Sequence, residues 1–130
     1  MEDNYFTTLP EEAFEGMMAL EDLSFAFCNL KSLPEGIFQD LSSLKYMYFN
    51  YNELSTLPEG IFQGLTSLEE LILGNNYFRT FPDGIFDDLV SLENLWIANN
   101  DLISLSDGIF NGLESLVELT ITGNSLDCLP

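Results

Sequence analysis

Apolar residues recur along this chain with a period of 24 residues. Leu20, Leu44, Leu68, Leu92 and Leu116 mark the period, with no insertion or deletion between them. When this leucine is counted as position 1, apolar residues also recur at positions 4, 6, 11, 14, 18, 19 and 22. An unbroken period of this length predicts a solenoid, in which each repeat forms one coil that packs against its neighbours.

The same register runs through the whole chain. It predicts a single repeat domain over residues 1–130, with a partial repeat at 1–19, full repeats at 20–43, 44–67, 68–91 and 92–115, and a partial repeat at 116–130. Solenoids need polar caps at their ends, and the sequence shows no obvious cap at either end. We therefore expect either a segment of a longer array, which we favour, or ends that associate with each other.

Each repeat predicts one short strand and one irregular return limb. Positions 4 to 6 alternate as a strand buried on one face does. Stacked coils would pair about five such strands into a curved parallel sheet on the concave side, with strands roughly 4.8 Å apart. Proline at position 15 opposes a helix in the return limb, so we expect extended chain and short helical turns on the convex side. The position-19 phenylalanines should stack there as a spine, namely Phe38, Phe62, Phe86 and Phe110.

Position 9 is predicted to form a structural asparagine ladder. A buried amide is costly unless its hydrogen bonds are satisfied, and an asparagine in each coil can bond its own loop and the neighbouring coil. The ladder residues are Asn4, Asn52, Asn76, Asn100 and Asn124, and Cys28 takes the place of asparagine in the first full repeat as a small buried thiol.

These residues carry a family resemblance. The pattern LxxLxLxxNxLxxLPxGxFxxLxx resembles the 24-residue leucine-rich repeat of animal extracellular proteins. The segments PEGIF and PDGIF are similar to those of variable lymphocyte receptors and Toll-like receptor ectodomains. The resemblance implies a leucine-rich-repeat solenoid of the α/β horseshoe class and an extracellular or cell-surface location as part of a larger protein. The first 20 residues do not have the pattern of a signal peptide.

The two cysteines are not expected to pair with each other. Cys28 and Cys128 lie four coils apart, which corresponds to roughly 19 Å, far beyond disulfide reach. The run Asn124-Ser-Leu-Asp-Cys-Leu-Pro resembles the approach to a cysteine-bearing C-terminal cap. That resemblance implies a partner for Cys128 beyond Pro130.

The charge is strongly negative. The sequence has 22 acidic residues against Lys31, Lys45 and Arg79, which gives a formal net charge of −19. Such a surface disfavours nucleic acid and anionic lipid, and it would attract cationic partners. Adaptation for solubility explains the charge equally well. No stretch approaches the roughly 20 apolar residues of a membrane span, so direct membrane insertion is not expected.

The sequence also argues against catalysis and a metal site. It has no histidine and two isolated cysteines, so it cannot form the usual nucleophile–base pairs or zinc sites. Asp83, Asp87 and Asp88 could be imagined around calcium, but they do not form the known calcium-loop pattern. We expect no enzyme activity, no cofactor and no metal.

The candidate binding residues lie at outward positions of the predicted strands and of the turn after them. Exposed aromatics with charge around them are typical of an interaction hot spot, although single exposed aromatics are common on any surface. The predicted ligand-binding residues are Tyr46, Tyr48, Tyr51, Ile72, Trp96, Glu70 and Asn94, and Phe27 shares position 8 with Tyr51.

The function we favour from the sequence is a non-enzymatic recognition module that binds a protein or peptide through the concave face. The alternative is a structural, assembly or adhesion protein that self-associates through its ends or binds carbohydrate surfaces.

Overall fold

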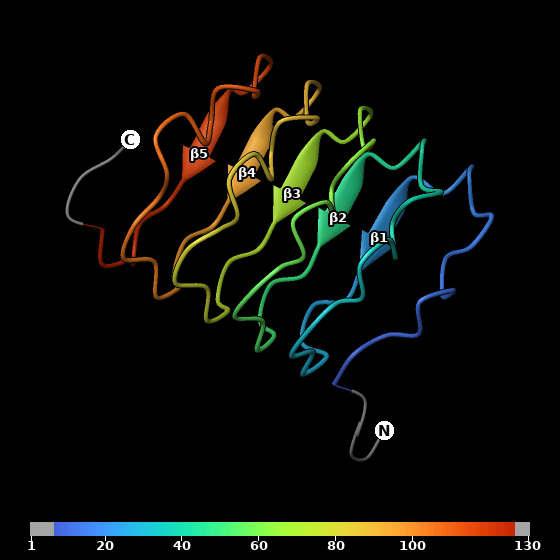
Figure 1. The fold of residues 1–130 in the computed structure, drawn as a ribbon, viewed down its shortest axis with the longest axis horizontal. Coiled ribbons are helices and arrows are strands. Elements are labelled where there is room, and N and C mark those ends of the chain that lie inside the picture. Colours follow the sequence, from blue (N-terminus) through green and yellow to red (C-terminus); the bar gives the residue numbers. More distant parts are fainter. Residues whose placement is uncertain (1–6, 127–130) are drawn as a thin grey trace.

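The computed structural model describes residues 7–126, and its strands form one parallel sheet in chain order (Figure 1). Each strand has three residues, and each strand residue pairs with the residue one period further along. The repeat period is therefore the register of the sheet, and the predicted solenoid is confirmed. The strands are β1 (Asp22–Ser24), β2 (Tyr46–Tyr48), β3 (Glu70–Ile72), β4 (Asn94–Trp96) and β5 (Glu118–Thr120).

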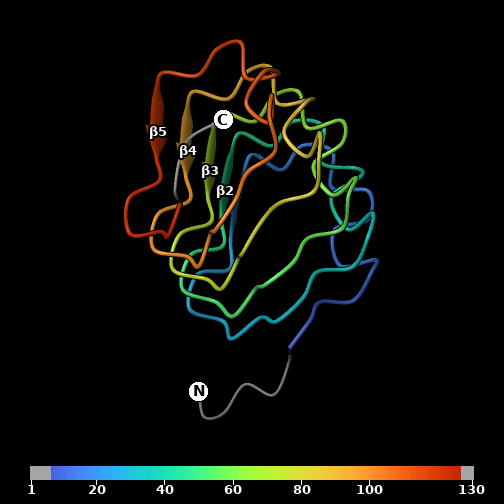
Figure 2. The same cartoon turned by 60° about the vertical axis from the view of Figure 1, so that its left-hand side comes forward.

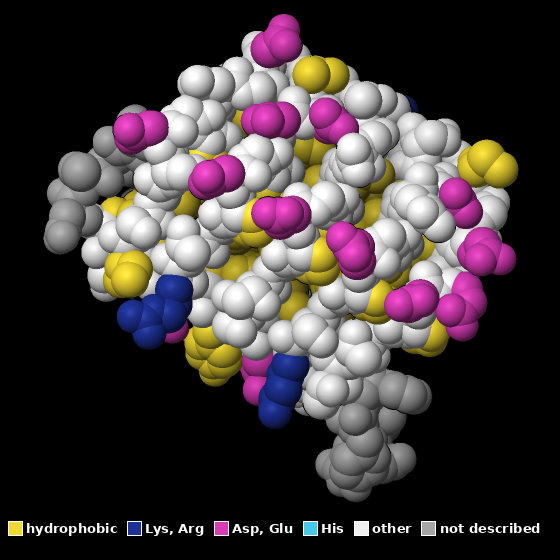
Figure 3. Space-filling view, in the orientation of Figure 1, with side chains coloured by type: hydrophobic (Ala, Val, Ile, Leu, Met, Phe, Trp, Pro, Cys, Tyr) yellow, Lys and Arg dark blue, Asp and Glu magenta, His cyan; other side chains and the backbone are white. Residues whose placement is uncertain are grey.

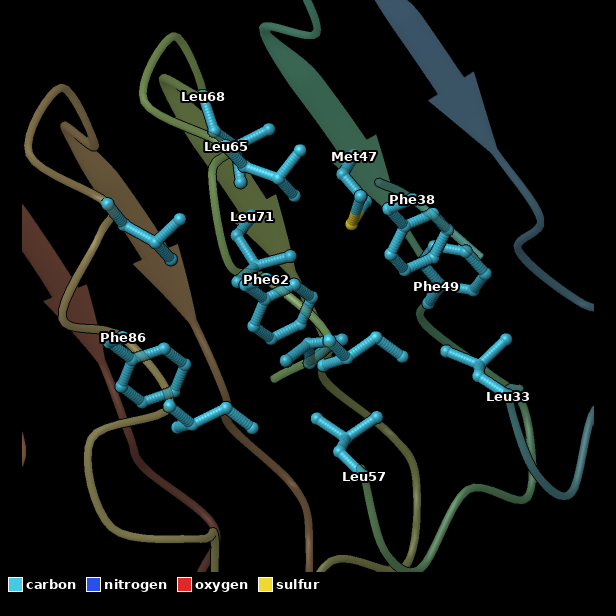
Figure 4. Packing of buried hydrophobic residues seen from close by; sticks show 14 of the residues in the cluster. Leu33, Phe38, Met47, Phe49, Leu57, Phe62, Leu65, Leu68, Leu71 and Phe86 are labelled. Carbon is cyan, nitrogen blue, oxygen red and sulfur yellow. The ribbon is translucent and has the colours of Figure 1, made fainter. Parts of the chain in front are cut away.

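The core lies between the sheet and the return limbs, which occupy opposite sides of the molecule (Figure 2). The middle residue of each strand points into this core, and Met47, Leu71 and Leu95 are completely buried. Position-1 leucines such as Leu44 and Leu68 pack beside them. Strand and limb side chains meet in one continuous cluster (Figure 4).

The predicted phenylalanine spine is confirmed and begins one coil earlier than expected. Successive rings from Phe14 through Phe38, Phe62 and Phe86 to Phe110 are stacked, with centroid separations of 6.2, 6.5, 6.4 and 6.3 Å. The large rings fill the space between the return limbs and the sheet. Apolar burial along this spine therefore contributes to each coil-to-coil interface from Phe14 to Phe110.

The return limbs contain single hydrogen-bonded turns, and no helix occurs among residues 7–126. In one coil, Ile61 N–H donates to Pro58 O at 3.2 Å and Gln63 N–H donates to Gly60 O at 3.0 Å. A helix would need a bond from every successive N–H, whereas these bonds come from every second residue. The expected short helical turns are thus a run of separate turns. Glycines at positive φ, such as Gly84 at 73°, contribute to the interruption.

Neighbouring coils also approach closely at position 21 of the return limb. Asp40 Oδ2 accepts a hydrogen bond from Gly16 N, and Asp88 Oδ2 accepts one from Gly64 N, both at 2.9 Å. At Gly112, an added Cβ would lie 2.7 Å from both Cα and O of Asp87. Because these contacts are with backbone atoms, residue 112 must be glycine.

The position-9 amides of Asn52, Asn76, Asn100 and Asn124 form hydrogen bonds between successive coils, while Asn4 lies outside the described residues. Each amide Nδ2 donates to the position-6 carbonyl of its own coil and to that of the preceding coil, at 2.8–3.2 Å. Each Oδ1 accepts an N–H from the preceding coil. The amides therefore bond the coils together along the line where no sheet partner is available.

Cys28 takes a reduced part in this ladder. Its side chain is half-buried, and Sγ lies 3.4 Å from Ala26 O as a weak donor. Its backbone N–H donates to Asn52 Oδ1 at 3.0 Å. Cys128 lies outside the described residues, so the expectation that the two cysteines do not pair stays a prediction.

Candidate protein-binding surface

The structure brings six of the seven predicted binding residues together on three adjacent strands. In the β2–β3–β4 register, Tyr46 pairs with Glu70, and Glu70 pairs with Asn94. The second row consists of Tyr48, Ile72 and Trp96 in the same order. The seventh residue, Tyr51, lies in the turn after β2. We call this set of outward-facing side chains, together with Phe27, the concave patch.

Ile72 differs from its expected role. It lies in the outward row, yet only 7 % of its surface is exposed, and it does not belong to the core cluster beneath the sheet. Its row neighbours are the larger side chains of Tyr48 and Trp96. Ile72 therefore forms the floor of the concave patch between taller aromatic side chains, and it is not a protruding contact.

A short hydrogen bond joins the two rows. The Tyr48 hydroxyl donates to Glu70 Oε1 at 2.6 Å. Burial raises the pKa of Tyr48 to about 12, with the hydrogen bond and the negative charge of Glu70 adding to the effect. Tyr48 is therefore a neutral donor at physiological pH, and the bond holds the Glu70 carboxylate in place on the surface.

Trp96 lies on β4, at one edge of the patch, and its indole packs closely over Gly74, which follows β3. A Cβ added to Gly74 would lie 3.2 Å from Trp96 Nε1 and 3.0 Å from Ala98 O. The missing side chain of Gly74 therefore leaves the space in which the indole lies, while 43 % of Trp96 stays exposed. The role of Gly74 does not follow from the hydrophobic pattern, although a glycine directly after Leu73, at position 7 of the repeat, is a usable signal.

Phe27 and Tyr51 form an exposed stacked pair beside the strands. Their ring centroids are 4.5 Å apart with an interplanar angle of 7°, and 70 % of Phe27 and 48 % of Tyr51 are exposed. Both residues have φ of 60°. This left-handed conformation is unfavourable for bulky side chains, and the same position in the next three coils holds Asn75, Asn99 and Gly123.

The charges around the patch are mostly uncompensated. Lys45 lies 3.3 Å from Glu21, and its hydrogen bond and charge interaction with Glu21 raise the pKa of the lysine. The Lys31 ammonium nitrogen lies 4.0 Å from Glu53 Oε1. Two of the three basic side chains are thus engaged with carboxylates already. The remaining acidic side chains leave a negative field that would favour a cationic ligand.

The opposite, convex face also carries many acidic side chains (Figure 3). Several Asp and Glu side chains lie in a diagonal row across this face (Figure 3). The return limbs also carry an acidic residue at position 16 of each full repeat, namely Glu35, Glu59, Asp83 and Asp107. An open hollow of about 420 Å³ is lined by four carboxylates of the return limbs and by Gly60, Gln63, Gly84 and Ile85; the carboxylates are those of Glu35, Glu59, Asp87 and Asp88.

Residues 7–126 contain no group of side chains that could hold a metal ion and no candidate membrane-spanning helix. The imagined calcium ligands Asp83, Asp87 and Asp88 do not form a group of metal-ligating side chains there, and Asp88 already accepts the Gly64 N–H. Within the same described residues, no helix is long and apolar enough to cross a membrane.

The chain belongs to the leucine-rich repeat family. The family model described as leucine rich repeat matches residues 20–78 and 66–126. Domains of this family are generally protein-interaction modules and typically non-catalytic, and no enzyme family was matched.

Among solved structures, the chain is similar to the leucine-rich repeat domain of APL1. The TM-score is 0.90 with 25 % sequence identity, over 95 % of this chain and 32 % of the APL1 chain. This chain thus spans about a third of that protein domain's length. A comparison with curated proteins gave no match.

Proposed function

We propose that the concave patch binds a protein or peptide ligand, and that ligands with basic side chains are favoured. The observation that carries this proposal is the Phe27–Tyr51 pair. Two bulky residues occupy a left-handed backbone conformation, where each costs about 1–2 kcal/mol relative to a relaxed conformation. Neither ring is buried in the core, so packing of the fold does not account for them.

The surroundings of the pair support the same proposal. Tyr46, Tyr48 and Trp96 extend the aromatic surface across β2 to β4. Aromatic side chains of this kind supply large contact areas at low conformational-entropy cost and dominate binding energies at interfaces. The Glu70 carboxylate, fixed by Tyr48, adds a localised negative charge for a basic group.

The resemblance to extracellular repeat proteins supports a location outside the cell or at its surface. We include this location in the proposal as the setting in which the concave patch would meet its ligand.

The proposal can be tested by selecting linear peptides from a displayed random library on the purified protein at physiological ionic strength. Screening by salt limits non-specific attraction to the acidic surface. The affinity of each selected peptide is then measured for the wild type, for a Phe27→Asn/Tyr51→Asn double variant and for Tyr77→Ala. The asparagines copy the residue that Asn75 and Asn99 provide at the same backbone conformation.

We expect the double variant to lose about tenfold or more in affinity, as hot-spot residues do. Tyr77→Ala should change affinity less than twofold, because Tyr77 is an aromatic of similar exposure, 54 %, outside the strands. Asparagine relieves the strained backbone, so the double variant should remain folded. Selected peptides that bind both variants like the wild type would reject the concave patch as the binding site.

A further inference from the structure

A small hollow on the concave face lies over β4 and between the strands on either side. Its lining is symmetrical about this strand: Asn94, Leu95 and Trp96 come from β4, Glu70 and Ile72 from β3, and Glu118 and Thr120 from β5. The cavity volume is about 40 Å³. Sites for small organic ligands are typically roughly 300–1,000 Å³, so this hollow can take the end of one side chain and little more.

The hollow combines two carboxylates with an aromatic wall and an apolar floor. The register aligns Glu70, Asn94 and Glu118 in one row across three strands. Glu70 and Glu118 therefore stand about 10 Å apart at the backbone, two strand spacings, with a neutral amide between them. In the second row, the exposed Trp96 rises beside the buried Ile72.

We propose that this hollow is the subsite for a single arginine side chain of the ligand, an inference that rests on the proposed function. A guanidinium is planar, stacks on an indole face, and carries five N–H donors that can reach acceptors on both sides. The acceptors here are the Glu70 and Glu118 carboxylates and the Asn94 amide oxygen. The alkyl stem of the arginine would lie along the apolar floor.

Lysine matches the same hollow less well. Its ammonium is a compact, strongly hydrated point charge with three donors. It cannot bridge two carboxylates on opposite sides while also stacking a flat face on Trp96. The hollow therefore predicts arginine specificity, which overall negative charge alone would not produce, because non-specific attraction depends on ligand charge and not on its shape.

Two features of the fold hold the subsite in shape before a ligand binds. Tyr48 fixes Glu70 through the 2.6 Å hydrogen bond, which leaves the second carboxylate oxygen for the ligand. Gly74 leaves the space into which the Trp96 indole packs. Preorganisation of this kind reduces the entropy lost on binding.

The experiment compares two acetylated and amidated hexapeptides of equal charge, one of arginine and one of lysine, each carrying a fluorescent label. Their affinities are measured by fluorescence anisotropy at physiological salt. The chain contains one tryptophan, so emission of Trp96 in a parallel titration with the unlabelled peptides reports directly on the subsite.

We expect the arginine peptide to bind about fivefold more tightly than the lysine peptide and to change the emission of Trp96. Trp96→Ala and Glu118→Gln should each reduce the preference below twofold. Glu114→Gln makes the same change of charge at an exposed residue outside the strands, and it should leave the preference intact.

Equal affinities in the wild type, or a preference that survives both Trp96→Ala and Glu118→Gln, would overturn the arginine subsite. Either result leaves the proposed function standing if selected peptides still depend on Phe27 and Tyr51. If selected peptides do not depend on that pair, the proposed function fails independently of the hexapeptide comparison.

Discussion

Replacing Asn76 by alanine should remove the central link of the asparagine ladder. The Asn76 amide donates to Phe49 O and Leu73 O, both at 3.0 Å, and accepts the Leu54 N–H at 3.0 Å. The two carbonyls keep a second amide donor, from Asn52 and Asn100. The buried Leu54 N–H has no second acceptor among the bonds of the described residues.

The expected loss of stability follows from the contrast between the two carbonyls, which keep a donor, and the Leu54 N–H, which loses its acceptor. An orphaned buried donor costs about 1–3 kcal/mol, and each of the two lost bonds to shared carbonyls costs about 1 kcal/mol. We therefore expect Asn76→Ala to lower the free energy of unfolding by about 3–5 kcal/mol. This is a large share of the roughly 5–15 kcal/mol that stabilises a typical domain. The effect should be concentrated at the interfaces between three successive coils, on which solenoid stability depends.

The assay is equilibrium unfolding in urea, followed by circular dichroism and by Trp96 fluorescence. Asn111→Ala is the matched control, since Asn111 is exposed and outside the ladder, and it should change stability by less than about 0.5 kcal/mol. A loss below about 1 kcal/mol for Asn76→Ala would refute the reasoning that the ladder satisfies otherwise unpaired backbone groups.

Three further predictions address other parts of the structure. Because the pKa of Tyr48 is raised to about 12 from an ordinary 10.0, the stability it contributes is complete below pH 10 and is lost as pH rises towards 12. In an ultraviolet titration of tyrosinate, one tyrosine should ionise last, and Glu70→Gln should bring it closer to the others; a single common transition would contradict this. Gly112→Ala should destabilise the fold by about 1–3 kcal/mol in thermal unfolding, because the added Cβ clashes with the backbone of Asp87. Gly60→Ala is the control and should be tolerated, because its added Cβ meets only a flexible side chain at 3.4 Å. Phe62→Ala should cost about 3–5 kcal/mol, because the ring is 1 % exposed in the middle of the spine; a cost below about 1 kcal/mol would mean that the spine does not stabilise coil stacking.

The features that recur in every coil could be predicted from the sequence. A residue such as Asn76 or Phe62 has the same neighbours one period away on either side, so its environment follows from the period alone. The parallel strand register and the phenylalanine spine are confirmed, and the position-9 amides bond neighbouring coils. The return limbs contain the expected extended chain and short turns, but their arrangement as separate turns could not be predicted, since the alternation of turn-forming bonds around proline and glycine is not visible in hydrophobic periodicity.

The candidate site could be located from the sequence but not described in detail. Outward positions do not repeat, so their geometry depends on which side chains happen to be neighbours. Ile72 is covered because larger side chains flank it, and Trp96 packs as it does because Gly74 leaves space. The stacking of Phe27 on Tyr51 likewise depends on a backbone conformation that only the structure shows.

The central claim is that the concave patch is the recognition surface. Its most direct test is a titration of the isotope-labelled protein with a selected peptide, followed by amide chemical shifts and by the single indole N–H of Trp96. We predict that the shifts concentrate on β2, β3 and β4, on the turn carrying Tyr51, and on the indole. Shifts confined to the acidic return limbs of the convex face would contradict the claim.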